Sequence, residues 1–200
     1  MIYDTTIHDL KTKSIYFRKN VSWFFSSKDQ LYSLSNMASG MPIDFRGIRY
    51  NSSEQLYQCC KYHSDTVFLS GDKNQTELNI RDHILKANNA MGAKIAQKCA
   101  VSAGLVRPDW YPPKEVRIYA MLWVLELKAI QNIEFRNALI STENNDIVEI
   151  SRHDNFWGCK HVLAGQLIGN NILGKLLMLV RDNLSNILVN GPNNSAGYLL

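Results

Sequence analysis

Residues 112–131, PPKEVRIYAMLWVLELKAIQ, carry the strongest helical pattern in the chain. The two prolines suit the first turn of a helix, where no backbone N–H is needed. The larger apolar residues lie close to one stripe at helical spacing: Val116, Tyr119, Leu122, Trp123 and Ile130. Charged residues interrupt the apolar run well short of the roughly 20 residues that cross a bilayer. The segment therefore predicts a long helix with one apolar face and not a membrane span.

Shorter patterns elsewhere predict a mixture of helices and strands. Further helices are expected over residues 51–62, 74–87, 89–101, 132–142 and 171–184. Strands are expected over 21–25 and 146–151, with a hairpin over 42–50 that turns at Arg46-Gly47. Together these elements predict an α+β fold: a mostly helical single domain with a few short strands. We expect an N-terminal extension over residues 1–20, the main folded domain over 21–186 and a C-terminal tail over 187–200.

Composition and charge exclude several classes of protein. The chain of 200 residues is 46% hydrophobic and 20% charged, which suits one soluble globular domain. Its net charge of +4 is spread along the sequence, so no basic tail binds nucleic acid by charge alone. An anionic small ligand, or an occasional contact with a phosphate backbone, is compatible with this balance.

The four cysteines and five histidines form neither a disulfide pattern nor a zinc pattern. There is no Cys-x-x-Cys and no His-Glu-x-x-His, and the adjacent Cys59 and Cys60 are poorly placed to bridge each other. The first residues, MIYDTTIHDLKTKS, lack the pattern of a secretory signal. We therefore expect a reduced, cytoplasmic protein with no metal, no cofactor and no membrane association.

A row of polar residues, Glu54, Gln58 and Lys61, follows one stripe of the helix expected over 51–62. The opposite face is expected to be buried and consists of Leu56, Cys59, Cys60 and His63. Two ordinary interpretations are a solvated helix face and a cap in which Glu54 pairs with Asn51. If Ser52 is the cap instead, Gln55 completes the capping box and Glu54 is available for chemistry.

The stretch RHDNFWGCK, residues 152–160, places a carboxylate and an indole directly after an expected strand, where ligands often bind. A glycine after Trp157 permits a backbone turn. One interpretation makes Asp154 a cap and Trp157 a core residue, whereas the other makes both of them ligand contacts. The pattern does not decide between these two. Cys159 has no histidine at a useful spacing, so a nucleophilic cysteine is not favoured.

The stretch GNNILGKLLM, residues 169–178, nearly matches a phosphate-binding loop but fails as one. Leu176 stands where the magnesium-binding hydroxyl belongs. Apolar residues already repeat at helical spacing from Ile172, and the middle of a helix cannot cradle phosphates. The stretch still predicts a helix N-terminus at Asn170 and Asn171. This end of the helix either binds an anion or is simply capped by asparagine.

These stretches occur together and in a fixed order: LSNM, RGIRYNSSEQLYQCCKY, AMG, Trp110, VEISRHDNFWG and GNNILGKLLMLVR. In that order the chain resembles the NADAR family from about Phe24 to Leu184. The most specific pieces are the Ser-Glu-x-x-x-Gln-x-x-Lys helix and the Asp-x-x-Trp-Gly turn. Two departures are Gln55, where family members often carry histidine, and CKHVLAGQLI, where the segment after Trp-Gly is commonly short and glycine-rich. The second departure bears on the choice of leaving base.

The resemblance implies an N-glycosidase, which cuts the bond between ribose C1 and a nitrogen. Family members act on N-ribosylated pyrimidine intermediates of riboflavin synthesis or remove ADP-ribose from guanine bases in nucleic acids. Carried over by motif, the catalytic residues are Glu54, Lys61 and Asp154. The substrate-binding residues carried over in the same way are Asn36, Gln58, Met91, Gly92, Trp110, Trp157, Gly158 and Asn171.

Cleavage of this bond builds positive charge on C1 and the ring oxygen, which a nearby carboxylate stabilises. We expect Glu54 to be that carboxylate, with Asp154 holding a ribose hydroxyl or acting as a second catalytic group. Lys61 either holds a phosphate, pairs with Glu54 or attacks an opened ribose as a neutral amine. Trp157 is expected to stack on a base or to shield the sugar.

The expected partners are an ADP-ribose-containing ligand, an N-ribosylated small molecule or a nucleic acid that carries ADP-ribose. One alternative is a non-catalytic module that binds ADP-ribose or a nucleotide without cutting it. A further alternative is an unrelated helical domain in which Glu54 and Asp154 are only caps. Convergence of the candidate side chains on one cavity would exclude this last alternative.

Overall fold

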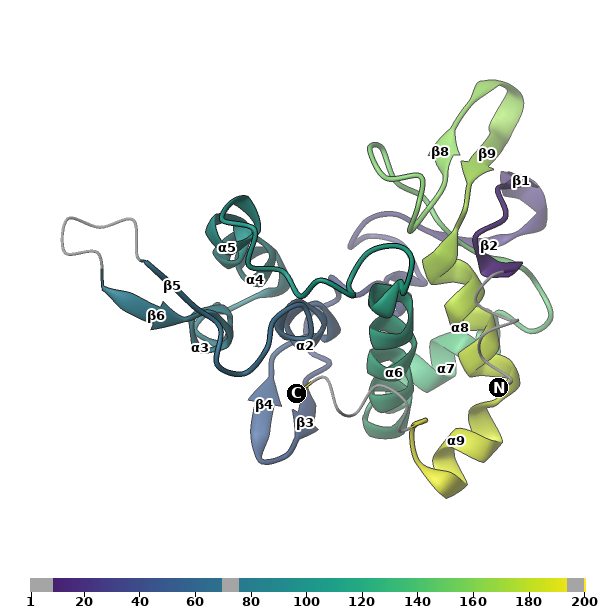
Figure 1. The fold of residues 1–200 in the computed structure, drawn as a ribbon. Coiled ribbons are helices and arrows are strands. Elements are labelled where there is room, and N and C mark those ends of the chain that lie inside the picture. Colours follow the sequence, from purple (N-terminus) through teal and green to yellow (C-terminus); the bar gives the residue numbers. More distant parts are fainter. Residues whose placement is uncertain (1–8, 70–75, 194–199) are drawn as a thin grey trace. The chain divides into compact units, whose positions relative to one another are not determined.

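The computed structural model describes residues 9–69, 76–193 and 200. Short helices and strands alternate along the chain (Figure 1), and the predicted α+β class is confirmed. The chain divides into two compact units. Unit 1 comprises Met1–Ser35 and Asn132–Gly191, and unit 2 comprises Asn36–Gln131 and Pro192–Leu200. We take each unit by itself.

Unit 1 is built on short strands from both of its sequence segments. β1 (Ser14–Phe17) pairs antiparallel with β9 (Gln166–Gly169), and β8 (Lys160–His161) pairs antiparallel with the other edge of β9. β2 (Ser22–Phe24) pairs in parallel with β7 (Ile147–Glu149). A buried apolar cluster lies against these strands and consists of Val148, Ile150, Cys159 and Leu167. β1, which lies inside the expected N-terminal extension, is thus part of a sheet.

The helices described in unit 1 are α7 (Ile133–Ser141), α8 (Ile172–Asp182) and α9 (Leu184–Asn190), with the 3-10 turns η1 (Arg18–Asn20), η2 (Tyr32–Leu34) and η3 (Leu163–Gly165). α8 packs against β7, and its predicted apolar stripe is buried. α9 was not predicted: the last predicted helix ends at Leu184, and residues 187–200 were assigned to a tail. It forms because Leu184 and Ile187, about one turn apart, are both buried.

Unit 2 gathers around α6 (Val116–Gln131), the helix predicted from residues 112–131. It is buried on nearly every side, including Trp123 at its centre. A helix buried all round is the core of its unit and not a surface element. Both α2 (Ser53–Cys59) and the strand β3 (Ile43–Phe45) contact it.

The remaining elements of unit 2 surround α2 and extend from it. β3 and β4 (Ile48–Tyr50) form the predicted hairpin, whose turn has φ angles of 49° at Arg46 and 77° at Gly47. β5 (Val67–Leu69) pairs with β6 (Glu77–Asn79). The helices α3 (Ile80–Leu85), α4 (Ala90–Ala96) and α5 (Lys98–Ser102) follow, and both α3 and α4 contact α2.

Two helices of unit 2 differ from the prediction. The helix expected over 74–87 begins only at Ile80, because Asn79 Oδ1 accepts the amides of Arg81 and Asp82 at 2.9 and 3.3 Å and caps α3 there. Glu77–Asn79 is a strand, and residues 74 and 75 lie outside the described part. The helix expected over 89–101 is two helices, α4 and α5, which meet at Gln97. Within the described ranges, no helix has the length and apolar character needed to cross a bilayer.

Candidate active site

The cap of α2 leaves Glu54 uninvolved. Ser52 Oγ accepts a hydrogen bond from the amide of Gln55 at 3.2 Å, which makes Ser52 the N-cap. Gln55 Oε1 accepts from the amide of Asn51 at 2.7 Å, and its Nε2 donates to the carbonyls of residues 84 and 87, each at 3.0 Å. The hypothesis that Ser52 is the N-cap is confirmed, whereas the reciprocal hydrogen bond of Gln55 goes to the amide of Asn51 and not to that of Ser52.

The polar row of α2 is buried, so the solvated-face interpretation is wrong. Glu54 is 6% exposed and Gln58 is 2% exposed. Gln58 Nε2 donates to Glu54 Oε1 at 2.6 Å, which partly offsets the cost of burying the carboxylate. The apolar face of the helix is buried as predicted except at His63, which is exposed because α2 has already ended at Cys59.

Asn36 joins this group from the segment before the hairpin. Its carbonyl accepts from the amide of Glu54 at 3.2 Å and from Ser53 Oγ at 3.3 Å, and its Nδ2 donates to Met121 Sδ at 2.7 Å. Among the described residues, Asn36 Oδ1 and Gln58 Oε1 are buried acceptors without a hydrogen-bond partner. An unsatisfied buried acceptor costs about 1–3 kcal/mol. Two such acceptors close to one buried carboxylate distinguish this group from ordinary core packing.

Lys61 lies just beyond the end of α2 and is partly buried. Its Nζ donates to Gln97 Oε1 at 3.4 Å, and Tyr62 Oη donates to the same oxygen at 2.8 Å. Burial, with the nearby charge of Lys94, lowers the pKa of Lys61 to about 8 against the opposing effect of Glu54. Lys61 thus interacts electrostatically with Glu54. Sequence reasoning missed Gln97, because nothing in the intervening residues links it to Lys61.

Trp110 packs on α2 through Tyr57. Their ring centroids are 5.2 Å apart, and both side chains are buried. Burial, with the charge of Glu54, raises the pKa of Tyr57 well above its ordinary value, so Tyr57 stays neutral beside the carboxylate. Trp110 is only 1% exposed, so its side chain is surrounded by protein. Its role in substrate binding stays a prediction.

Met91 and Gly92 lie at the start of α4, which packs against α2. Asn89 Oδ1 accepts from the amide of Gly92 at 2.8 Å and caps this helix. Met91 is 55% exposed, which leaves its side chain accessible. The assignment of both residues to substrate binding stays a prediction.

In unit 1, Asp154 organises the turn that follows β7. Its Oδ1 accepts from the amides of Phe156 and Trp157 at 2.8 and 2.9 Å, and its own amide donates to Ser151 Oγ at 3.0 Å. The capping interpretation is therefore correct for one carboxylate oxygen. The other oxygen, Oδ2, has no hydrogen-bond partner among the described residues, so capping and ligand binding are compatible.

Trp157 and Gly158 hold this turn against α8 and β7. The carbonyls of Phe156 and Trp157 accept from the amides of Ile172 and Leu173 at 3.1 and 3.0 Å. Trp157 is partly buried and meets Phe156 edge to face at 5.1 Å. A Cβ on Gly158 would lie 2.6 Å from the carbonyl oxygen of Glu149. Close approach to β7, and not a special turn geometry, is thus what requires glycine at this position.

Asn171 ties α8 to β7 from a fully buried position. Its Nδ2 donates to the carbonyl of Ile147 at 2.8 Å, and its Oδ1 accepts from the amide of Glu149 at 3.2 Å. The amides of Asn170 and Asn171 donate to the carbonyls of residues 155 and 158. Both interpretations of this helix N-terminus are therefore wrong: the two amides already donate to carbonyls of the Asp-x-x-Trp-Gly turn, and the Asn171 side chain makes no capping hydrogen bond to α8. Substrate binding by the Asn171 side chain stays a prediction.

Replacing Gly174 by alanine is expected to destabilise unit 1 strongly. A Cβ there would lie 2.0 Å from the carbonyl oxygen of Ile147 and 2.5 Å from Asn171 Nδ2, so α8 would have to move off β7. Overpacking of this kind costs about 1–3 kcal/mol or more. Thermal unfolding should show a clearly lower melting temperature for Gly174→Ala. The control is Gly92→Ala, where the nearest atom is 3.3 Å away; equal melting temperatures for the two variants would contradict the expectation.

The candidate residues fall into two groups, one in each unit. Unit 2 brings together Asn36, Glu54, Gln58 and Lys61 on and around α2, with Trp110 packed behind and Met91 and Gly92 on the adjoining α4. Unit 1 brings together Asp154, Trp157, Gly158 and Asn171 on one turn and the start of α8. Convergence of both groups on a single cavity stays a prediction.

Two further kinds of chemistry, metal binding and a cysteine nucleophile at Cys159, depend on side chains outside these two groups. No group of three or more histidine, cysteine or acidic side chains within the described ranges is placed to hold a metal ion. Cys159 is fully buried, and burial raises the pKa of its thiol to about 11. Since the thiolate is the nucleophile, a buried thiol of this kind is inert near neutral pH.

Comparison with known proteins places this chain in a family. The NADAR domain matches residues 16–185, which is most of the chain. The chain therefore belongs to the NADAR family, as the ordered motifs predicted.

Two curated relatives carry functional names. The chain is 28% identical over 142 residues to "Riboflavin biosynthesis protein VVA0006" of Vibrio vulnificus, a match that covers 71% of this chain and 33% of that protein. It is 34% identical over 83 residues to "N-glycosidase Npun_R5314" of Nostoc punctiforme, covering 42% of this chain and 49% of that protein. The chain thus spans at most about half the length of these relatives.

The fold also has a solved counterpart. The NMR structure of the Escherichia coli protein YbiA superposes with a TM-score of 0.63 over 90% of this chain and 94% of that one, at 24% identity. At this identity the likeness establishes a shared fold and leaves the chemistry to be argued from the side chains.

Proposed function

We propose that this chain is an N-glycosidase that hydrolyses the bond between ribose C1 and a nitrogen. The observation that carries the proposal is the buried carboxylate of Glu54, which lies outside the helix cap and is flanked by two unsatisfied acceptors on Asn36 and Gln58. Membership of the NADAR family and the relative named N-glycosidase support it.

The proposed substrate is an ADP-ribosylated guanine base, in a nucleotide or a nucleic acid, or a related N-ribosylated metabolite. The relative named as a riboflavin biosynthesis protein supports the metabolite as an alternative. Ribose hydroxyls are hydrogen-bond donors, and the acceptors of Asn36 and Gln58 would receive them once the side chains that cover these two atoms move to admit the substrate.

In this proposal Glu54 acts on the developing charge at C1. As the bond to nitrogen breaks, the electron pair leaves with the base, and positive charge spreads over C1 and the ring oxygen. Glu54 stabilises that charge in a buried site where electrostatic interactions are strong. Gln58 orients the carboxylate through its 2.6 Å hydrogen bond. Water then adds to C1, and the proton that it loses ends on the nitrogen of the released base.

Asp154 is proposed to hold a ribose hydroxyl through Oδ2, while Oδ1 maintains the turn. Trp157, fixed on the same turn, is proposed to stack on a base.

The direct test is incubation of the purified chain with ADP-ribosylated guanosine and with an oligonucleotide that carries ADP-ribosylated guanine. Released ADP-ribose, together with the restored guanosine or unmodified oligonucleotide, is measured by chromatography and mass spectrometry. Release from either substrate supports the proposal and identifies its class. Tight binding of both substrates without release would favour the non-catalytic module instead.

Lys61 is expected to form a reducible adduct with the sugar. Attack of its neutral amine on C1 of an opened ribose expels water and gives an imine, which borohydride reduces to a stable secondary amine. Because the pKa of Lys61 is lowered from 10.5 to about 8, the reactive neutral fraction should rise as the pH rises through 8. Mass spectrometry after borohydride treatment should therefore locate the adduct on Lys61, in greater yield at high pH.

The nearby Lys94 provides the matched control for this experiment. Lys61→Arg should abolish the adduct, because arginine stays protonated, whereas Lys94→Arg should retain it. If no adduct forms and Lys61→Arg keeps most of the activity, Lys61 only pairs with a phosphate or with Glu54.

The lowered pKa of Lys61 also predicts a dependence of stability on pH. Between about pH 8 and 10.5 the unfolded chain binds more protons at Lys61 than the folded chain does, so the contribution of Lys61 to the free energy of unfolding should rise with pH over this range.

A further inference from the structure

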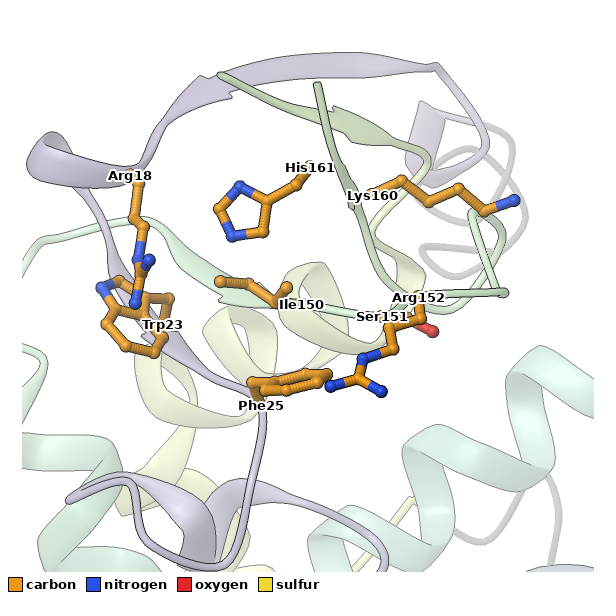
Figure 2. A pocket seen from close by; sticks show the side chains of 8 residues that line it. All are labelled: Arg18, Trp23, Phe25, Ile150, Ser151, Arg152, Lys160 and His161. Carbon is orange, nitrogen blue, oxygen red and sulfur yellow. The ribbon is translucent and has the colours of Figure 1, made fainter. Parts of the chain in front are cut away.

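Unit 1 contains a cavity whose lining residues have no part in the proposed cleavage. Its volume is about 520 Å³. The lining side chains belong to η1, to β2 and the residue after it, to the segment that follows β7, and to β8. The residues on which the argument depends are Arg18, Trp23, Phe25, Arg152, Lys160 and His161. Figure 2 shows Arg18, Trp23, Phe25, Arg152 and His161 around a common space, with the ammonium of Lys160 directed outward.

The charge of this cavity is uniformly positive. Arginine and lysine side chains line it and no acidic side chain does. Within the described ranges, Arg18, Arg152 and Lys160 form no ion pair with a carboxylate. The amides of Ser26 and Phe25 donate to Asp29 Oδ2 at 2.6 and 2.7 Å and lower the pKa of this carboxyl group, with a smaller contribution from the charge of Arg18. Asp29 therefore offsets part of the Arg18 charge from a distance, whereas no such partner acts on Arg152 and Lys160 within the described ranges, and this excess of cationic groups favours an anionic ligand.

Aromatic rings support the two guanidinium groups. The Arg18 guanidinium carbon lies 3.7 Å from the ring centroid of Trp23, and that of Arg152 lies 5.3 Å from the ring of Phe25. At 3.7 Å the Arg18 guanidinium lies against the Trp23 ring, a contact that restricts its movement and leaves N–H groups able to bind the paired oxygens of a phosphate. Phe25 itself is 43% exposed, which is a large apolar surface beside the two cations.

We propose that this cavity binds a nucleotide unit, with the phosphate on Arg18 and Arg152 and the base against Phe25. Interleaved cations and rings are the arrangement that holds phosphate and base together without reading sequence. The volume is in the range of small-molecule sites. Ser151 Oγ, which lines the cavity, accepts the amide of Asp154, so the cavity adjoins the Asp-x-x-Trp-Gly turn. The inference does not depend on the proposed cleavage, because none of its ligand contacts belongs to that set of residues.

The test measures binding of three probes: guanosine monophosphate, an eight-residue single-stranded oligonucleotide and inorganic pyrophosphate. Arg18→Gln with Arg152→Gln should weaken binding of the first two by at least about tenfold. The control double variant is Lys28→Gln with Arg49→Gln, which removes two exposed charges outside the cavity and gives the same net charge. Phe25→Leu should weaken nucleotide binding while leaving pyrophosphate binding unchanged. Circular dichroism and melting temperature confirm that each variant is folded.

Each outcome decides the proposal. Equal losses in the cavity and control variants would overturn it in favour of general charge attraction. Pyrophosphate binding as tight as nucleotide binding, with no effect of Phe25→Leu, would overturn the assignment of the base. Failure of every probe to bind at millimolar concentration would overturn the site. Tighter binding of the oligonucleotide supports a nucleic-acid strand as the source, and equal binding of mononucleotide and oligonucleotide supports a free nucleotide.

Discussion

Glu54→Gln should lower the turnover of an N-glycosidic substrate by about 10²-fold or more while the protein stays folded. The carboxylate is the buried charge of α2, and the amide replaces it at the same size without the negative charge that C1 requires. The fold should tolerate the change, because Gln58 is able to turn its amide and offer Oε1, which has no other described partner, to the new amide. Substrate affinity should change less than turnover.

Glu126→Gln is the matched control for this variant. Glu126 is also a buried glutamate of unit 2, and burial raises the pKa of its carboxyl group, but it accepts the amide of Asn193 and belongs to no candidate site. Its replacement should leave turnover nearly unchanged. Near-normal turnover in Glu54→Gln, with melting temperatures alike in both variants, would remove Glu54 from its assigned role.

Trp157→Ala should weaken substrate binding by about 1–3 kcal/mol if its indole stacks on a base. The intact substrate is best measured in the Glu54→Gln background, where cleavage is expected to be slow. Because Asp154 Oδ1 holds the amide of residue 157 and not its side chain, the turn should persist after the ring is removed. Calorimetric titration gives the affinity, and thermal unfolding of the same preparation gives the stability.

The neighbouring ring provides the control for this second variant. Phe156 meets Trp157 edge to face at 5.1 Å and is partly buried as well. Phe156→Ala should therefore reproduce any loss of packing without removing the proposed stacking surface. If both variants lose stability alike and neither loses affinity, Trp157 is a packing residue only.

Local patterns in the sequence determined much of the fold and of the helix that carries Glu54. The stripe of α6, the hairpin at Arg46-Gly47 and the cap formed by Ser52 and Gln55 each depend on residues within one turn or one hairpin. Such short-range patterns can be recognised in the sequence without knowledge of the segments that pack against them in the folded protein. The order of the motifs likewise placed the chain in its family, because several weak local matches in sequence are jointly specific.

Only the tertiary structure decided whether the polar row faced solvent or the interior. A helical period fixes which residues share a face, but burial depends on what packs against that face. The contacts that bury Glu54 and Gln58, lower the pKa of Lys61 and bring Gln97 to its amine come from segments distant in sequence. The basic cavity of unit 1 arises in the same way, because Arg18 and Arg152 belong to the two separate segments that form the parallel pair β2 and β7.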